Sequence, residues 1–186
     1  MKNLKCHTVR KLWFPALLVA VLLAVCCCGC FEGGEGGDAG SNSATAGEKN
    51  ALRSAKTYLA VQAFSYNGLV EQLKFEGYSE EEASYGADNC GADWNEQAKK
   101  SAKNYLTVQA FSHSGLVAQL KFEGFTEEQA SHGADNCGAD WMEQAKKSAA
   151  QYLKLMAYSK DALIAQLEFD GFTHEQAVYG AEVNGL

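Results

Sequence analysis

Apolar and polar positions between residues 111 and 130 predict two short helices joined by a glycine turn. Ser112 stands at an N-cap position, and the residues that follow it form one apolar stripe at helical spacing. Gly124 is expected to end this helix, because glycine adopts the left-handed C′ conformation without the steric cost of a Cβ atom. Thr126 and Gln129 then form the sequence signature of a capping box, which predicts the start of a second helix.

The same unit occurs twice more, at Phe64–Ala83 and at Tyr158–Ala177, so the chain is an internal repeat with a period of 47 residues. The copies Ala51–Gln97 and Ala98–Gln144 agree at 35 of their 47 positions, and a truncated third copy follows. Copies this similar must share one fold. A period near this length is typical of stacked helical units.

Each copy is predicted to contain three helices, because a further helix precedes the unit described above. In the second copy it begins at Asp93, which is expected to cap the helix with Glu96 at the third helical position. The helix starting there makes the connection between copies helical. Trp94 and Trp141 lie at these joints, where we expect them to pack between modules rather than to contact a ligand.

The predicted fold class is therefore all-α, with three tandem, three-helix modules that resemble helix–turn–helix units. Module boundaries are predicted at residues 50–96, 97–143 and 144–186. In the predicted third helix of each copy, small residues recur at helical spacing, which would let another helix approach closely. Cys90 and Cys137 lie on that stripe, and both a disulfide between them and two free thiols are open, with free thiols favoured because equivalent faces of stacked copies are too far apart.

The N-terminal segment, residues 1–30, has the composition of an export signal. It contains no acidic residue, and its basic residues are Lys2, Lys5, Arg10 and Lys11. An apolar run at residues 12–28 follows, so the positive end is expected to remain in the cytoplasm and the repeats to lie outside. Residues 31–49 are glycine-rich, have little to bury and are predicted to be a disordered linker.

Cysteines at the end of this segment indicate a lipid anchor. Bacterial lipoprotein signals resemble the sequence Leu-Ala-Val-Cys-Cys-Cys-Gly-Cys that ends at Cys30. Gly29 is small enough to precede the cleaved bond, so Cys30 is the expected lipidation site, with Cys26 as the alternative. An uncleaved anchor with cysteines acting as small apolar residues is the competing interpretation.

The balance of charge argues against binding to nucleic acid. Because residues 1–30 hold four positive charges and no acid, the remaining chain has a formal net charge of −11, against −7 for the whole chain. Lysine and arginine must neutralise phosphates in such complexes, and the predicted third helices instead begin with Glu80 and Glu127. The helix–turn–helix pattern is therefore not interpreted as a DNA-binding motif.

No catalytic, cofactor or metal motif occurs in the sequence. His113, His132 and His174 do not share a repeat position, and neither a His-x₃-His nor a Cys-x₂-Cys spacing is present. Neither Gly-x-Ser-x-Gly nor a phosphate-binding loop occurs. We expect a protein that is not an enzyme and uses no cofactor.

Acidic helix starts and variable aromatic positions are the candidate contacts to a partner protein. Acids would attract a basic target, whereas positions that differ between copies are also expected from drift on a solvated surface. The candidate residues are Glu80, Glu81, Glu127, Glu128, Asp135, Tyr66 and Tyr85.

A specific resemblance is carried by the unit Ala-Phe-Ser-x-x-Gly-Leu-Val-x-Gln-Leu-Lys-Phe-Glu-Gly, followed by Gly-Ala-Asp-Asn and Ala-Asp-Trp. This unit resembles the Ltp-type host cell surface-exposed lipoprotein repeat over residues 51–186. The resemblance implies an all-α repeat fold used for protein contact. The third copy departs from the pattern at Ala162, Asp170, Glu182 and Val183 and ends early, which is expected of a capping unit.

The family includes prophage-encoded lipoproteins that act in superinfection exclusion, in which the injection of incoming phage DNA is blocked at the cell surface. With the export signal and the lipid-anchor sequence, we expect a monomeric, lipid-anchored protein on the extracellular face of the cell membrane. Its expected partner is another protein, such as a basic tail protein or an injected phage protein. A structural or adhesive surface protein without an antiviral role is the alternative.

Overall fold

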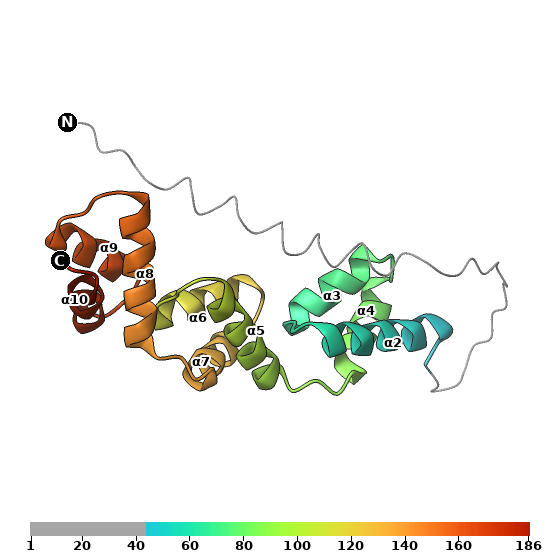
Figure 1. Cartoon of the computed structure of the whole chain (residues 1–186). Helices are drawn as coiled ribbons and strands as arrows, with labels where there is room; N and C mark the ends of the chain where they lie inside the picture. Colours follow the sequence, from blue (N-terminus) through green and yellow to red (C-terminus); the bar gives the residue numbers. More distant parts are fainter. Residues whose placement is uncertain (1–43) are drawn as a thin grey trace. The chain divides into compact units, whose positions relative to one another are not determined.

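The computed structural model describes residues 44–186, and this part of the chain consists of helices joined by turns, without a strand (Figure 1). All described helices belong to one compact unit, residues 43–186. The predicted export signal at 1–30, its cysteines Cys26 and Cys30, and the linker up to residue 43 lie outside the described residues. The predicted all-α class is confirmed.

The helices form three triplets, one for each sequence repeat (Figure 1). Module 1 consists of α2 (Ala46–Val61), α3 (Tyr66–Phe75) and α4 (Glu80–Asn89). Module 2 consists of α5 (Trp94–Val108), α6 (His113–Phe122) and α7 (Glu127–Asn136). Module 3 consists of α8 (Trp141–Leu155), α9 (Lys160–Phe169) and α10 (His174–Val183). Each repeat thus holds the three helices that its sequence predicts.

The sequence boundaries and the helix boundaries differ in phase. A repeat period has no intrinsic starting point, and the boundaries drawn before residues 97 and 144 fall inside α5 and α8. The chain therefore crosses them as helix, whereas the non-helical links between the helix triplets are residues 90–93 and 137–140.

The caps of the second and third helices lie where the sequence predicts them. Ser112 accepts a hydrogen bond from the backbone N–H of Gly115 at 3.0 Å. Thr126 and Gln129 exchange two bonds, at 3.1 and 3.2 Å, and form the predicted capping box. Gly124 follows α6 with a φ of +91°, the left-handed conformation expected of a C′ glycine.

Two predictions about first helices are wrong. The linker was expected to extend to residue 49, but α2 begins at Ala46, because Thr45 and Glu48 form a capping box. A capping box was also expected at Asp93. Its side chain does cap α5, but the Glu96 carboxylate binds the Lys99 ammonium at 2.9 Å rather than returning to the cap. A cation one turn away competes with the neutral backbone N–H for that carboxylate.

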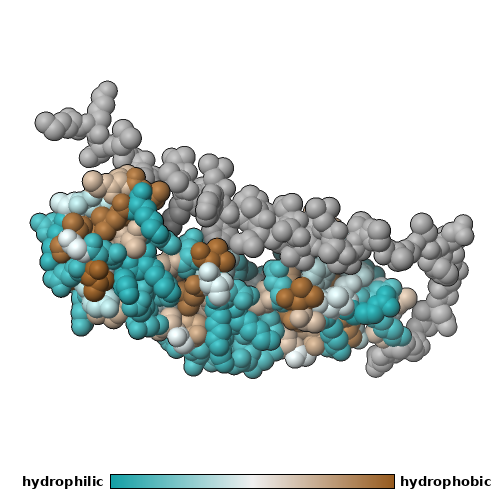
Figure 2. All heavy atoms as spheres, viewed as in Figure 1, coloured by the Kyte–Doolittle hydropathy of each residue, from teal (hydrophilic) through white to brown (hydrophobic). Residues whose placement is uncertain are grey.

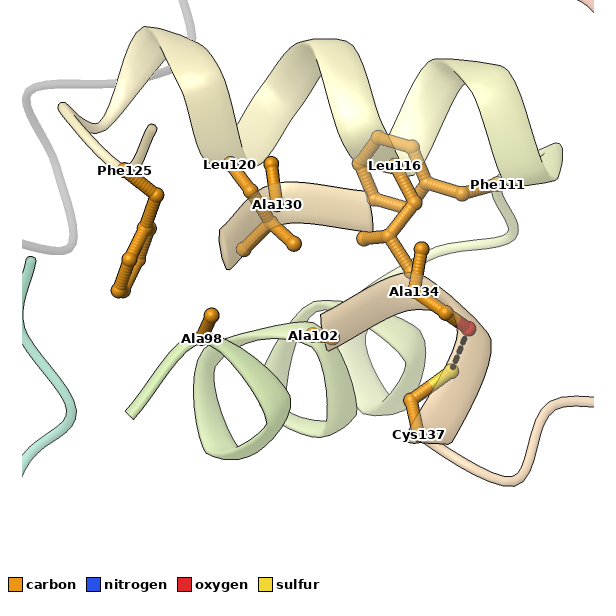
Figure 3. Close-up of a cluster of buried hydrophobic side chains, with 9 residues drawn as sticks. All are labelled: Ala98, Ala102, Phe111, Leu116, Leu120, Phe125, Ala130, Ala134 and Cys137. Carbon is orange, nitrogen blue, oxygen red and sulfur yellow. Dashed lines mark hydrogen bonds between the residues drawn. The ribbon is translucent and has the colours of Figure 1, made fainter. Parts of the chain in front are cut away.

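Every module buries its own hydrophobic core, built from leucines of the second helix and alanines of the first and third (Figure 3). In module 2 the core consists of Ala98, Ala102, Phe111, Leu116, Leu120, Phe125, Ala130, Ala134 and Cys137. The modules are therefore separate packing units that touch at limited joints.

Small side chains let the first and third helices of a module approach closely, as the sequence stripe predicts. A Cβ atom on Gly133 of α7 would lie 2.9 Å from the carbonyl carbon and oxygen of Ala98 in α5. The same approach recurs in the other modules, at Gly86 and at Gly180. Cys90 and Cys137 are free, and each thiol donates to the carbonyl oxygen three residues earlier at 3.1 Å.

Neighbouring modules are joined by a repeated hydrogen bond. The Ser65 hydroxyl, at the N-cap of α3, donates to the carbonyl oxygen of Glu123 after α6 at 2.5 Å. The Ser112 hydroxyl donates in the same way to the carbonyl oxygen of Asp170 after α9, also at 2.5 Å. Ser65 and Ser112 are each 2% exposed, whereas Ser159, the equivalent cap in module 3, is exposed. Each joint thus fastens a helix start to the following module's turn.

The tryptophans pack at the joints, as predicted. Trp94 is the first residue of α5, and its ring meets Tyr66 of α3 edge-on with 5.6 Å between ring centroids. Trp141 at the start of α8 meets the His113 ring of α6 at 5.2 Å. Each ring also packs against the core of the preceding module. The first residue of one helix triplet therefore covers the core of the triplet before it.

Candidate partner-binding surface

The first acid of each third helix in modules 1 and 2 is held by a lysine of the preceding helix. The Glu80 carboxylate contacts the Lys74 ammonium at 2.5 Å, and Glu127 pairs with Lys121. In module 3 the order of charges is reversed, and His174 on α10 contacts a carboxylate of α9 at 2.7 Å. These contacts fasten the second helix to the third. Glu80 and Glu127 therefore have a structural role that the sequence interpretation did not assign to them.

The second acidic residue of the third helix in modules 1 and 2 is more accessible to a partner than the first. Glu81 and Glu128 are exposed, and neither forms an ion pair with another of the described residues. The pKa of the Glu81 carboxyl is lowered by its own backbone N–H and then by the Ser79 hydroxyl. Its charge thus reinforces the helix N-terminus while the side chain stays open to solvent.

Asp135 belongs to a second repeated contact between the same two helices. Its carboxylate lies 2.7 Å from Nε2 of His113, which connects the end of α7 to the start of α6. In module 3 the ammonium of Lys160 contacts the carboxylate of Glu182 at 2.9 Å at the equivalent positions. Asp135 is 61% exposed, so it remains accessible despite this contact.

The two tyrosine candidates are only partly accessible. Tyr66 packs against Trp94, and burial raises the pKa of its phenol, with a further rise from its hydrogen bond to Asp88. Tyr85 is half-buried on α4. The structure thus places Tyr66 in an intermodule joint, where a packing role accounts for it.

Sequence reasoning missed a set of exposed apolar residues at helix ends. Phe75, Phe122 and Phe169 end the second helices and are 72%, 78% and 72% exposed. Val61, Val108 and Leu155 end the first helices and are 73%, 62% and 79% exposed. Their recurrence at the last residue of each helix is visible in the repeat, but only the structure shows that they face solvent.

It also missed Glu123, a carboxyl at the joint between modules 1 and 2. Burial raises the pKa of Glu123 to about 7, and a hydrogen bond from the Ser101 hydroxyl at 2.9 Å opposes this rise. In module 3 the equivalent Asp170 accepts a hydrogen bond from the Tyr152 phenol at 2.6 Å. Burial, followed by this bond, raises the pKa of Tyr152.

Within 44–186, no group of three or more His, Cys, Asp or Glu side chains could hold a metal ion. A cavity of about 360 Å³ lies beside the α4–α5 link, and Lys56, Gln97 and Lys100 contribute to its lining. None of the helices in this part of the chain is both long and apolar enough to cross a membrane.

Comparison with known proteins identifies the repeat. The family described as host cell surface-exposed lipoprotein matches residues 47–90, 93–137 and 140–182, one match to each helix triplet. A solved structure of Ltp, a superinfection exclusion protein from the Streptococcus thermophilus temperate phage TP-J34, is 31% identical, with a TM-score of 0.49. The similarity covers 50% of this chain and 98% of that one. No curated protein matches the chain.

Proposed function

Because the chain belongs to the host cell surface-exposed lipoprotein family, we propose that it is a lipid-anchored surface protein that blocks the injection of phage DNA. The observation that carries the proposal is the threefold family match, which extends over nearly all of the described residues. Cys30 is the proposed lipidation site, with Cys26 as the alternative. Exclusion of superinfecting phage is then the role that the family resemblance favours.

The proposed mode of action is binding to a basic segment of another protein. A net charge of −11 after residue 30 attracts cationic targets. Glu81 and Glu128 present exposed carboxylates that form no ion pair with another of the described residues. The same charge disfavours nucleic acid as a partner. A monomer with an injected protein or a tail protein as its target fits these features.

A structural or adhesive surface protein is the second candidate. The exposed apolar residues at helix ends favour it, because they would serve contact with any surface protein equally well. The two functions differ in their consequence for infection. Only the first predicts that the protein changes the fate of adsorbed phage.

The test compares phage plating on host cells with and without the protein. With the full chain expressed, we expect fewer plaques at unchanged phage adsorption, because the block acts after attachment. The Cys30→Ser variant should lose this protection together with membrane retention. A Cys6→Ser variant is the matched control, because Cys6 lies in the same segment but outside the lipoprotein-like sequence.

Three outcomes would contradict parts of the proposal. Unchanged plating for every phage of the host, with the protein present at the surface, would favour the structural or adhesive role. Reduced adsorption would indicate receptor masking rather than a block of injection. If the Cys30→Ser variant is processed and retained at the membrane like the wild type, the lipidation site is Cys26 or the anchor spans the membrane.

A further inference from the structure

Phenylalanine recurs at one exposed position outside the three cores. Phe75, Phe122 and Phe169 are the last residues of α3, α6 and α9, and each is at least 72% exposed. Single exposed apolar residues are ordinary on protein surfaces. A large aromatic side chain at the same solvent-facing position of three modules is not explained by the cores, which are built from other residues.

Comparison of modules 2 and 3 shows that this position is retained while its surroundings change. The residues on either side of the phenylalanine change from Lys121 and Glu123 to Glu168 and Asp170, but the phenylalanine stays. At an ordinary exposed position, Thr107 in module 2 is replaced by a lysine in module 3. The aromatic ring is thus kept between modules 2 and 3 although both of its sequence neighbours differ.

The charges around the phenylalanines are predominantly negative. Beside Phe75, the Lys74 ammonium is held by Glu71 at 3.1 Å and by Glu80 at 2.5 Å, and Glu76 follows directly. Two carboxylates thus share one lysine, while the Glu76 carboxylate accepts a hydrogen bond from the Tyr58 phenol instead. An exposed apolar ring next to this excess of acids complements a partner whose apolar side chains are flanked by cations.

Phe169 likewise has acidic neighbours in the sequence. It stands directly between Glu168 and Asp170. His174, which contacts the Glu168 carboxylate at 2.7 Å, is the neighbouring basic group there. The hydropathy surface shows apolar areas set within a largely hydrophilic surface (Figure 2).

We propose that Phe75 and Phe169, together with Phe122 at the equivalent position, are apolar anchor points for a basic amphipathic helix of a partner protein. Such a helix would place apolar side chains against the rings and lysine or arginine side chains against the surrounding carboxylates. Large aromatic side chains commonly supply much of the binding energy at protein interfaces. The inference rests on the proposed protein-binding function and names the chemistry of its partner.

The test uses purified residues 44–186, which hold the three described cores and belong to one compact unit. The probe is a helix-forming peptide of leucine and lysine, about 18 residues long, with all leucines on one face. A peptide of the same composition in scrambled order, and a leucine–glutamate peptide of the same pattern, are the controls. Binding is measured by calorimetry at low salt.

The wild-type fragment should bind the amphipathic basic peptide and neither control. The double change Phe75→Ser and Phe169→Ser should weaken binding roughly tenfold or more, because the apolar anchors are lost. Phe75→Leu with Phe169→Leu should retain most of the affinity. Val183→Ser, a change at an exposed apolar residue outside the proposed surface, should leave binding unchanged. Circular dichroism should show equal helix content in all variants, since both rings are solvent-facing.

Equal binding by wild type and the serine double variant, or equal binding of the scrambled peptide, would overturn the inference. So would binding to phosphatidylcholine vesicles without binding to the peptide, because the surface would then contact lipid. Failure of the proposed function is recognised separately. If the serine variant loses peptide binding and the wild type still gives no protection against phage, the surface is correct and the antiviral role is not.

Discussion

At the scale of single residues, the joint between modules 1 and 2 gives Glu123 an environment that its sequence position does not reveal. Its backbone carbonyl oxygen accepts a hydrogen bond from the Ser65 hydroxyl, and burial raises the pKa of its carboxyl to about 7. The equivalent Glu76 in module 1 is exposed, and the partial burial of its carboxyl raises its pKa as well. The pKa of Glu123 is therefore set by its burial in the folded chain.

This shift predicts a pH dependence of stability. Because the pKa of Glu123 is higher in the folded chain than in the unfolded one, its contribution to stability is complete below about pH 4.5 and is lost as pH rises to about 7. Glu123→Gln should remove this loss and unfold at a higher temperature than wild type at pH 8. Thermal unfolding of the wild type and of Glu123→Gln at several pH values between about 4.5 and 8 measures this difference. Parallel curves for both proteins would show that Glu123 is solvated.

At the scale of elements, the packing of α5 on α7 depends on the absence of a side chain at Gly133. Gly133→Ala would place a methyl group 2.9 Å from two backbone atoms of Ala98, which cannot rotate away. We expect a loss of roughly 1–3 kcal/mol in the free energy of unfolding from this overpacking. Glu128→Ala on the same helix should change it by less than about 0.5 kcal/mol. Urea unfolding of residues 44–186 measures both, and equal values would contradict the close approach.

The serine joints provide a second prediction with an internal control. Ser112→Ala removes an N-cap and the intermodule bond to Asp170, whereas Ser159→Ala removes only an N-cap. The cap is worth about 1 kcal/mol and the additional bond about 1 kcal/mol more. Ser112→Ala should therefore destabilise the fragment about twice as much in urea unfolding. Equal losses would mean that the joint contributes nothing.

Helices and their caps could be predicted from the sequence because their signals are local. Ser112, Thr126 and Gly124 each act within a few residues, and the structure places them as expected. The intermodule hydrogen bonds connect residues 58 positions apart, so no local sequence pattern predicts them. The pairing of Glu127 with Lys121 was equally invisible, because it depends on how two helices meet.

At the scale of the whole molecule, a net charge of −11 after residue 30 predicts electrostatic steering of a basic partner. Since screening shortens to about 3 Å at 1 M salt, association should slow steeply with salt while dissociation changes less. Glu81→Gln with Glu128→Gln should slow association without disturbing the Glu80 and Glu127 ion pairs. Surface plasmon resonance with the leucine–lysine peptide measures these rates. Salt-independent association would contradict the steering.

The most direct test of the account is the amount of phage DNA that enters the cell. Phage is adsorbed to cells with and without the full-length protein, and intracellular phage DNA is quantified before replication begins. We predict equal adsorption and markedly less intracellular DNA when the protein is present, with entry restored by Cys30→Ser. Equal DNA entry in both strains, with the protein present at the cell surface, would contradict the claim that this repeat protein blocks injection.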